Sequence, residues 1–154
     1  MNNITFNKWL NLNGEVQNTE INLADFGLGN KYLVIFCFQS WCPGCHSAGF
    51  PSLEKLIQEF GHNNPNISFV AIQTVFEGFT SNGFDKLQET QKKYNLGIPF
   101  IQDEGSEMLQ PQIMETFETG GTPWFLFISA DKKLESSGFH TNLEKAIDYL
   151  KKQI

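Results

Sequence analysis

Two cysteines separated by two residues are the part of this sequence best suited to chemistry. Residues 40–46 read Ser-Trp-Cys-Pro-Gly-Cys-His, so the thiols belong to Cys42 and Cys45. Thiol–disulfide exchange needs a thiolate nucleophile, a second thiol that resolves the mixed disulfide, and surroundings that favour the anion. A Cys-x-x-Cys spacing at the start of a helix brings the two sulfurs together. The pattern predicts a redox-active disulfide between Cys42 and Cys45 that works without a metal or other cofactor.

The pair is expected between a buried strand and a helix. Lys31–Phe38 is too continuously apolar for a surface strand and predicts a central strand covered on both faces. Apolar residues then recur at helical spacing and predict a helix over 42–60, kinked at Pro51. Cys42 would lie at the helix N-terminus, where free N–H groups stabilise a thiolate. We therefore expect Cys42 to be the nucleophile and Cys45, one turn deeper, to resolve.

Three neighbours of the pair are expected to support it. Trp41 would shield the sulfurs and offer contact surface to a substrate. Pro43 suits the first helical turn, where its missing N–H costs nothing. Gly44 completes the Cys-Pro-Gly-Cys motif.

The rest of the chain predicts one α/β domain over residues 1–154, with a central mixed sheet flanked by helices. Asn13-Gly14 indicates an N-terminal β-hairpin extension within 4–17. An inserted βα unit is expected around residues 69–96. The further elements that the sequence predicts are a strand over 67–76, a helix over 84–94 closed by Gly97, a strand over 98–102, a helix over 112–118, strands over 124–129 and 134–139, and a last helix opened by a capping box at 141–144.

Charge and hydrophobicity exclude several classes of partner. The net charge of −6 argues against nucleic acid and anionic membranes. All eleven basic residues are lysines, so no guanidinium clamp is possible. No stretch approaches the length of a membrane span. Met1–Phe6 lacks the charge and apolar core of a signal peptide, which predicts a cytoplasmic location, or a periplasmic one if Met1 is not the native start.

A second motif stands before an apolar strand, where residues 120–124 read Gly-Gly-Thr-Pro-Trp. Together with Trp-Cys-Pro-Gly-Cys it resembles the thioredoxin superfamily, whose members carry a cis-proline on the loop that faces the cysteine pair. The resemblance implies a thioredoxin-like fold with a cis bond between Thr122 and Pro123. That bond would place the Thr122 backbone where an extended substrate chain can pair with it.

Within the superfamily the chain is most similar to the TlpA-like group and its redoxin relatives of the AhpC-TSA type. The hairpin, the Trp-Cys-Pro-x-Cys form, Pro51 and the inserted βα unit carry this resemblance. It implies a thiol–disulfide oxidoreductase that reduces or exchanges disulfides of proteins or small thiols. Such an enzyme also needs an electron donor, which the sequence does not identify.

The chain departs from its relatives beneath the cysteine pair. Phe36 stands where thioredoxins carry a buried Asp, and Ala48 where TlpA-like proteins often carry Glu. The proton acceptor for resolution is therefore expected elsewhere. Glu77, at the end of the second strand, and His46, one turn after Cys42, are the candidates for a proton relay.

Four alternatives remain open at this stage. The most serious is a thiol peroxidase of the peroxiredoxin type, although the arginine that polarises peroxide is missing. A second is a non-enzymatic thioredoxin-fold binding module. The Cys-x-x-Cys-His pattern also fits c-type haem attachment, with Met108 or Met114 as axial ligand. The last alternative is a zinc site that combines Cys37 with the pair and His46.

Overall fold

A seven-stranded mixed sheet positions the cysteine pair at the end of one of its interior strands. The computed structural model describes residues 4–27, 31–61, 63–139 and 142–154. The strand order is β3-β2-β7-β6-β5-β8-β9, with parallel neighbours in the middle of the sheet. Its main strands are β5 (Tyr32–Phe38), β6 (Ile67–Val75), β7 (Phe100–Glu104), β8 (Trp124–Ile128) and β9 (Leu134–Gly138). The strand predicted over Lys31–Phe38 is confirmed as an interior strand of an α/β sheet, over Tyr32–Phe38.

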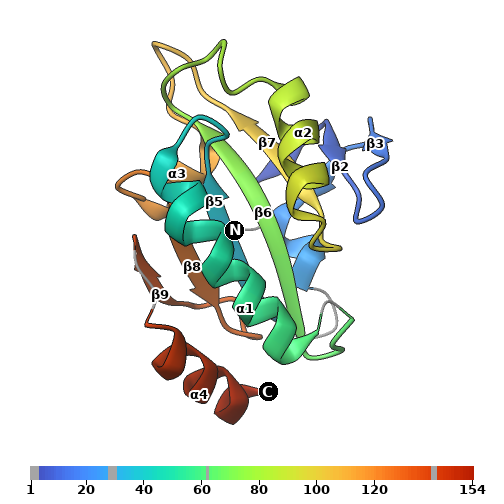
Figure 1. The fold of residues 1–154 in the computed structure, drawn as a ribbon, viewed down its shortest axis with the longest axis vertical. Helices are drawn as coiled ribbons and strands as arrows, with labels where there is room; N and C mark the ends of the chain where they lie inside the picture. Colours follow the sequence, from blue (N-terminus) through green and yellow to red (C-terminus); the bar gives the residue numbers. More distant parts are fainter. Residues whose placement is uncertain (1–3, 28–30, 62, 140–141) are drawn as a thin grey trace.

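Alternate residues of β5 enter two separate cores, as a pleated strand with two covered faces requires. One face, which carries Phe36 and Phe38, packs under α1 (Phe50–Phe60), α2 (Phe84–Tyr94) and α4 (Leu143–Gln153), as Figure 1 shows. The other face packs against the 3₁₀ helix η1 (Leu23–Gly27) and α3 (Gln112–Phe117). The prediction of a mixed sheet flanked by helices is therefore confirmed.

The predicted N-terminal hairpin is present and extends the main sheet. It consists of β2 (Trp9–Leu10) and β3 (Val16–Gln17), joined by a turn in which Gly14 has φ +81°. β2 pairs antiparallel with β7, so the hairpin forms one edge of the sheet. The flanking strands β1 (Thr5–Phe6) and β4 (Ile21–Asn22) form a small separate ladder.

The helix that follows the cysteines differs from the prediction in its first turns. Residues 43–60 are helical, but instead of an α-helix throughout with a kink at Pro51 they contain a π-helical turn, η2 (Cys45–Gly49), after which α1 begins at Phe50. Pro51 provides the reason, because it has no N–H for the carbonyl four residues earlier and its ring would clash with that carbonyl. A widened turn before the proline removes the clash.

Two helix ends also differ from the sequence interpretation. α2 ends at Asn95 in the left-handed conformation, with φ 48°, rather than at Gly97, and asparagine tolerates that conformation better than most residues. Asn142 caps α4 by accepting a hydrogen bond from the Lys145 N–H. The predicted capping box includes Thr141, which lies outside the described residues. Met1–Asn3, on which the predicted location partly depends, also lie outside them. In the described part of the chain no helix is long and apolar enough to cross a bilayer.

Candidate redox site

Cys42 and Cys45 form a disulfide at the carboxyl end of β5. Their Cα atoms are 5.3 Å apart, within the range that a disulfide requires. Cys45 is fully buried in the core beneath α1, whereas Cys42 is partly exposed. Cys42 is therefore the sulfur that a substrate can reach, in agreement with the order expected from the sequence.

The surroundings of Cys42 favour negative charge on its sulfur. The backbone N–H of Cys45 points at the Cys42 Sγ, with the nitrogen 3.2 Å away. The Thr122 hydroxyl oxygen lies 3.6 Å from the same sulfur. A thiolate released by reduction of the disulfide would accept hydrogen bonds from both groups at the start of a helix. The two donors belong to different segments, so the sulfur is approached from the helix and from the facing loop.

The Thr122–Pro123 loop faces the pair, and its peptide bond is cis. The Thr122 carbonyl oxygen lies 3.6 Å from the Cys42 Sγ. The cis bond expected between Thr122 and Pro123 is present, whereas the pairing of a substrate chain with Thr122 stays a prediction.

Gly49 allows this loop and the π-helical turn to approach closely. A Cβ at Gly49 would lie 2.8 Å from the Cβ of Pro123 and 2.7 Å from the Cζ of Phe36. Both distances are shorter than any side-chain contact can be. Gly49 was missed in the sequence, although a glycine inside an expected helix signals a close approach of this kind.

An open groove of about 410 Å³ runs beside Cys42, and we call it the Cys42 groove. Exposed Trp41 and half-exposed Phe139 stand at its sides, and it also contains Glu77. The Glu77 carboxylate accepts a hydrogen bond of 3.5 Å from Gln39, which is buried at the end of β5. The structure therefore brings Glu77 to the same groove as Cys42, and its role in proton transfer stays a prediction.

His46 has partners other than the one that the sequence suggested. Its Nε2 donates to the Ser40 carbonyl oxygen at 2.7 Å, and its Nδ1 forms a short hydrogen bond with the Tyr94 hydroxyl. Since Nε2 carries the proton, Tyr94 donates to Nδ1 when the ring is neutral. Both nitrogens are directed to these groups and neither contacts Cys42. The geometry gives His46 a positioning function rather than direct contact with the sulfur.

Buried amide side chains hold the segment that leads into the motif. The Gln73 carbonyl oxygen accepts from the Ser40 N–H at 2.6 Å, and the Asn82 side-chain oxygen accepts from the Trp41 N–H at 2.8 Å. Gln73 also donates to Gln102 at 2.8 Å. Buried amides with complete partners fix the backbone more firmly than apolar contacts do. This network was missed in the sequence, where the signal was a glutamine inside the apolar strand β6.

The zinc alternative is wrong, because its ligands do not meet. Cys37 is fully buried in the core on one face of the sheet, and Cys45 lies in the core on the other. Burial also raises the pKa of the Cys37 thiol, which disfavours the metal-binding thiolate. Within the described ranges, no three His, Cys, Asp or Glu side chains gather closely enough to hold a metal.

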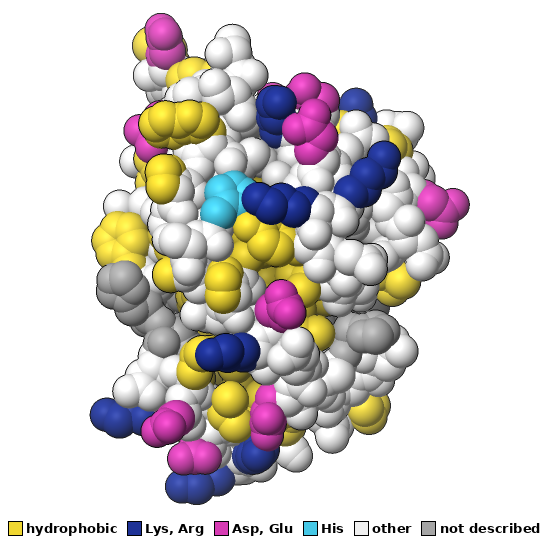
Figure 2. Space-filling view, in the orientation of Figure 1, with side chains coloured by type: hydrophobic (Ala, Val, Ile, Leu, Met, Phe, Trp, Pro, Cys, Tyr) yellow, Lys and Arg dark blue, Asp and Glu magenta, His cyan; other side chains and the backbone are white. Residues whose placement is uncertain are grey.

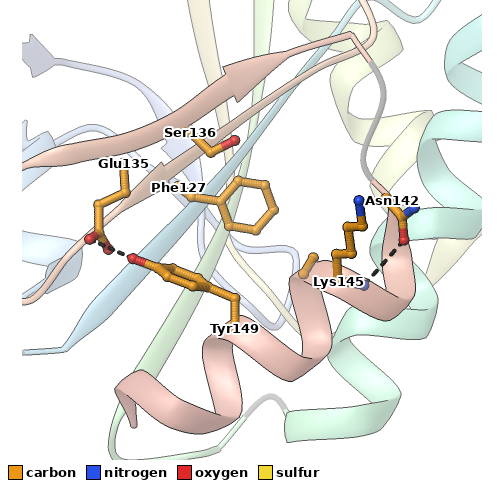
Figure 3. Close-up of a pocket in the computed structure, with 7 residues that line it drawn as sticks. Phe127, Glu135, Ser136, Asn142, Lys145 and Tyr149 are labelled. Carbon is orange, nitrogen blue, oxygen red and sulfur yellow. Dashed lines mark hydrogen bonds between the residues drawn. The ribbon is translucent and has the colours of Figure 1, made fainter.

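A separate cavity of about 290 Å³ lies between β9 and α4, where Figure 3 shows its side chains. The Tyr149 hydroxyl donates to the Glu135 carboxylate across it at 2.6 Å. Asn142 at its other end caps α4. None of the predicted site residues lines this cavity, so the chemistry of the chain is concentrated at the Cys42 groove.

Comparisons with known proteins agree with this fold. The model of the AhpC/TSA family matches residues 7–137. A thioredoxin-like superfamily protein of known structure is 24% identical, with a TM-score of 0.75 and 96% of each chain covered. A thiol-disulfide isomerase from Corynebacterium glutamicum is 21% identical, with a TM-score of 0.72 over 84% of this chain and 86% of that one.

A thiol-disulfide oxidoreductase from Bacteroides fragilis is 15% identical, with a TM-score of 0.71 and complete coverage of both chains (100%). At these identities the likeness establishes a shared thioredoxin-like fold. A comparison with curated protein sequences finds no match.

Proposed function

The chain belongs to the AhpC/TSA family, and we propose that within it the protein is a TlpA-like thiol–disulfide oxidoreductase that works through Cys42 and Cys45. The observation that carries the proposal is the position of the Cys42 sulfur, which is reachable from solvent and lies 3.6 Å from the carbonyl of the cis Thr122–Pro123 bond. A substrate chain that pairs with this carbonyl would bring its own sulfur to Cys42.

In the reducing direction, the Cys42 thiolate attacks one sulfur of a substrate disulfide. A mixed disulfide forms, and the first substrate thiolate leaves. The Cys45 thiol, after losing its proton, attacks the Cys42 sulfur and releases the second substrate thiolate. The substrate gains two electrons and Cys42–Cys45 becomes the disulfide, which an external dithiol donor must then reduce. The reverse sequence oxidises a substrate dithiol.

The Cys45 proton needs an acceptor, because Cys45 lies in an apolar core that raises the cost of ionisation. Glu77 is the candidate that fits best, since it lines the groove and its carboxylate is fixed by Gln39. His46 contributes by holding Ser40, and hence the start of the motif, in place.

A peroxiredoxin-type thiol peroxidase remains the second candidate, because the AhpC/TSA family is named after such enzymes. The chain lacks arginine, the usual donor to the peroxide oxygen, and it places a resolving cysteine one turn from the first. These features favour disulfide exchange. A non-enzymatic binding module would have no use for a pair whose outer sulfur is accessible. Haem attachment through both cysteines would leave the facing Thr122–Pro123 loop without a role, and a visible absorption spectrum tests it.

The test measures reduction of a protein disulfide, with insulin as substrate and dithiothreitol as donor. We expect Cys42→Ser to abolish the activity, and Cys45→Ser to stop after one step as a mixed disulfide that non-reducing mass spectrometry detects. Cys37→Ala is the matched control, because that thiol is buried on the opposite face of the sheet. Unchanged activity in both serine variants would refute the proposal. A peroxidase would instead consume one equivalent of peroxide in Cys45→Ser.

A further inference from the structure

We propose that the Cys42 groove selects extended polypeptide disulfides in which positively charged residues flank the cysteine, and disfavours anionic disulfides such as glutathione disulfide. This inference rests on the proposed function of the same cysteine pair. It is based on the lining of the groove, the charge within it, and the position of two neighbouring lysines.

The lining of the groove combines backbone next to the sulfur with two exposed aromatic rings, which suits an extended chain. Residues 120–122 line it beside the sulfur, and Trp41 and Phe139 flank it with exposed fractions of 67% and 44%. Gly121, with φ +151°, permits Phe139 to lie directly on the loop, because a Cβ there would be 3.1 Å from the ring. Two exposed aromatic rings and a backbone carbonyl in one groove suit a peptide, which pairs with main-chain groups and lays side chains on the rings.

Phe139 is held in this position from behind. Its ring meets the ring of Trp124 edge to face, with centroids 4.6 Å apart. The Trp124 indole N–H in turn donates to the Ser137 hydroxyl at 2.7 Å. The wall of the groove is thus fixed before a substrate arrives, which lowers the entropy that binding would cost.

A single fixed charge lies in the groove. Among the described residues that line it, Glu77 is the only ionisable side chain apart from the cysteine itself. The backbone N–H groups of Phe76 and Glu77 both donate to the buried Gln39 side chain, at 3.3 and 3.4 Å, so the segment is anchored. A cation beside the substrate cysteine is attracted to this carboxylate and an anion is repelled. The net charge of −6 acts in the same direction at longer range.

Two lysines lie in a neighbouring hollow, outside the groove, and have partners of their own. A neighbouring hollow on the other side of Trp41 is lined by Lys86 and Lys93 but not by Cys42. Lys86 pairs with Glu89 at 3.3 Å, and the Lys93 ammonium lies 5.3 Å from the centre of the Tyr94 ring. On the face shown in Figure 2, basic side chains are scattered among acidic and apolar ones rather than gathered in one field. An anionic disulfide bound at Cys42 therefore meets Glu77 and, among the described lining residues, no cation.

The experiment compares two blocked pentapeptides that differ only in charge, with lysine or glutamate on both sides of one cysteine. Each peptide carries the same neutral thiopyridine as a mixed disulfide, and released thiopyridone reports the first chemical step. The nucleophile is the reduced Cys45→Ser variant. It lacks the thiol that would resolve the mixed disulfide, so the measured rate is that of the attack by Cys42 alone. Each rate is divided by the rate with 2-mercaptoethanol, which corrects for the intrinsic reactivity of the peptide.

We expect the lysine peptide to react at least fivefold faster at low ionic strength, and 0.5 M salt to reduce this preference. Glu77→Gln, made in the Cys45→Ser protein, should bring the ratio of the lysine-peptide rate to the glutamate-peptide rate close to one. Glu77→Lys should invert this ratio. Glu54→Gln makes the same charge change on the exposed face of α1 and should leave the ratio unchanged. Glutathione disulfide should react no faster than the glutamate peptide.

Two results would overturn the inference while the proposed function stands. One is a ratio of lysine-peptide to glutamate-peptide rates that is the same with Glu77→Gln as in the Cys45→Ser parent. The other is a faster corrected reaction with glutathione disulfide than with the lysine peptide. The second would place recognition at the hollow of Lys86 and Lys93 instead. If Cys42 reacts with no disulfide faster than 2-mercaptoethanol does, the oxidoreductase proposal itself fails.

Discussion

The imidazole of His46 donates a hydrogen bond of 2.7 Å to the backbone carbonyl of Ser40. The two residues bracket the cysteine pair, one immediately after Cys45 and the other two positions before Cys42. The bond therefore closes a loop around the disulfide. Tyr94 on α2 holds the other nitrogen of the ring and ties this loop to the neighbouring helix.

We expect His46→Ala to lower the free energy of unfolding of the oxidised protein by about 1–3 kcal/mol, because the Ser40 carbonyl and the Tyr94 hydroxyl lose their partner together. Denaturant unfolding followed by fluorescence measures this change. The variant should also shift the reduction potential of Cys42–Cys45, since the helical turn that carries the cysteines loses its hydrogen bonds to Ser40 and Tyr94. A purely structural histidine would leave that potential unchanged.

Tyr94→Phe provides the control for these hydrogen bonds of His46, because it keeps the ring that stacks on Phe50 and removes only the hydroxyl. It should cost less than His46→Ala. In the double variant the two effects should not add, since each removes the same hydrogen bond. Additive losses would show that His46 and Tyr94 stabilise the protein independently, against the geometry.

A second prediction concerns the close packing of Gly49 against the cis-proline loop. Gly49→Ala should lower the free energy of unfolding by about 2–3 kcal/mol, because the new methyl would overlap Phe36 and Pro123 in a packed core. Gly44→Ala is the matched substitution. Its Cβ would lie at an ordinary 3.5 Å from Pro123, and its φ is −65°, so the change should be within about 1 kcal/mol of neutral. Chemical denaturation of both variants compares them, and equal stability would contradict the overlap.

Some of the site could be predicted from the sequence because it depends on strand ends. β5 and β6 are parallel neighbours, so the segments after the two strands emerge at the same edge of the sheet. This is why Cys42 and Glu77 line one groove, as their positions after two apolar runs indicated. The Thr-Pro pair was also recognisable, since proline is the residue for which a cis bond is accessible.

Other parts depend on contacts that only the folded chain makes. The Trp41 N–H donates to the side chain of Asn82, which lies in a loop after β6. Nothing in the local sequence of either residue indicates this pairing. Likewise the edge pairing of Leu10 with Phe100 depends on register across the sheet, which a two-residue strand does not specify. The π-helical turn is an intermediate case. Pro51 predicted a distortion of the helix, but not that the distortion would be a π-helical turn.

A third prediction concerns the thiol of Cys37. It is fully buried and burial raises its pKa, so both access and thiolate content are low. Native oxidised protein should therefore incorporate no iodoacetamide. Unfolding without a reductant should expose this one thiol, and unfolding with a reductant should expose all three cysteines. Intact mass spectrometry counts the labels. A label on the native oxidised protein would contradict either the burial of Cys37 or the disulfide.

A buried acid on β7 connects stability with pH. Asp103 is only 2% exposed, and its two carboxylate oxygens accept from the N–H groups of Gln112 and Ile113 at 3.0 and 2.9 Å, at the start of α3. Burial raises the pKa of Asp103 from 3.8 to about 6, although these two hydrogen bonds oppose the shift. Between these values the native protein holds a proton that the unfolded chain has released.

The stability contributed by protonated Asp103 should be complete below pH 3.8 and lost as the pH rises through about 6. We therefore expect the difference in unfolding free energy between wild type and Asp103→Asn to fall by about 2 kcal/mol from pH 4 to pH 7, since one pKa unit corresponds to about 1.4 kcal/mol and part of the shift lies below pH 4. Urea unfolding at several pH values measures it. Glu104→Gln, at the exposed neighbouring position, should give a flat difference. A difference for Asp103→Asn that stays constant or rises with pH would mean that the hydrogen bonds to α3 outweigh burial.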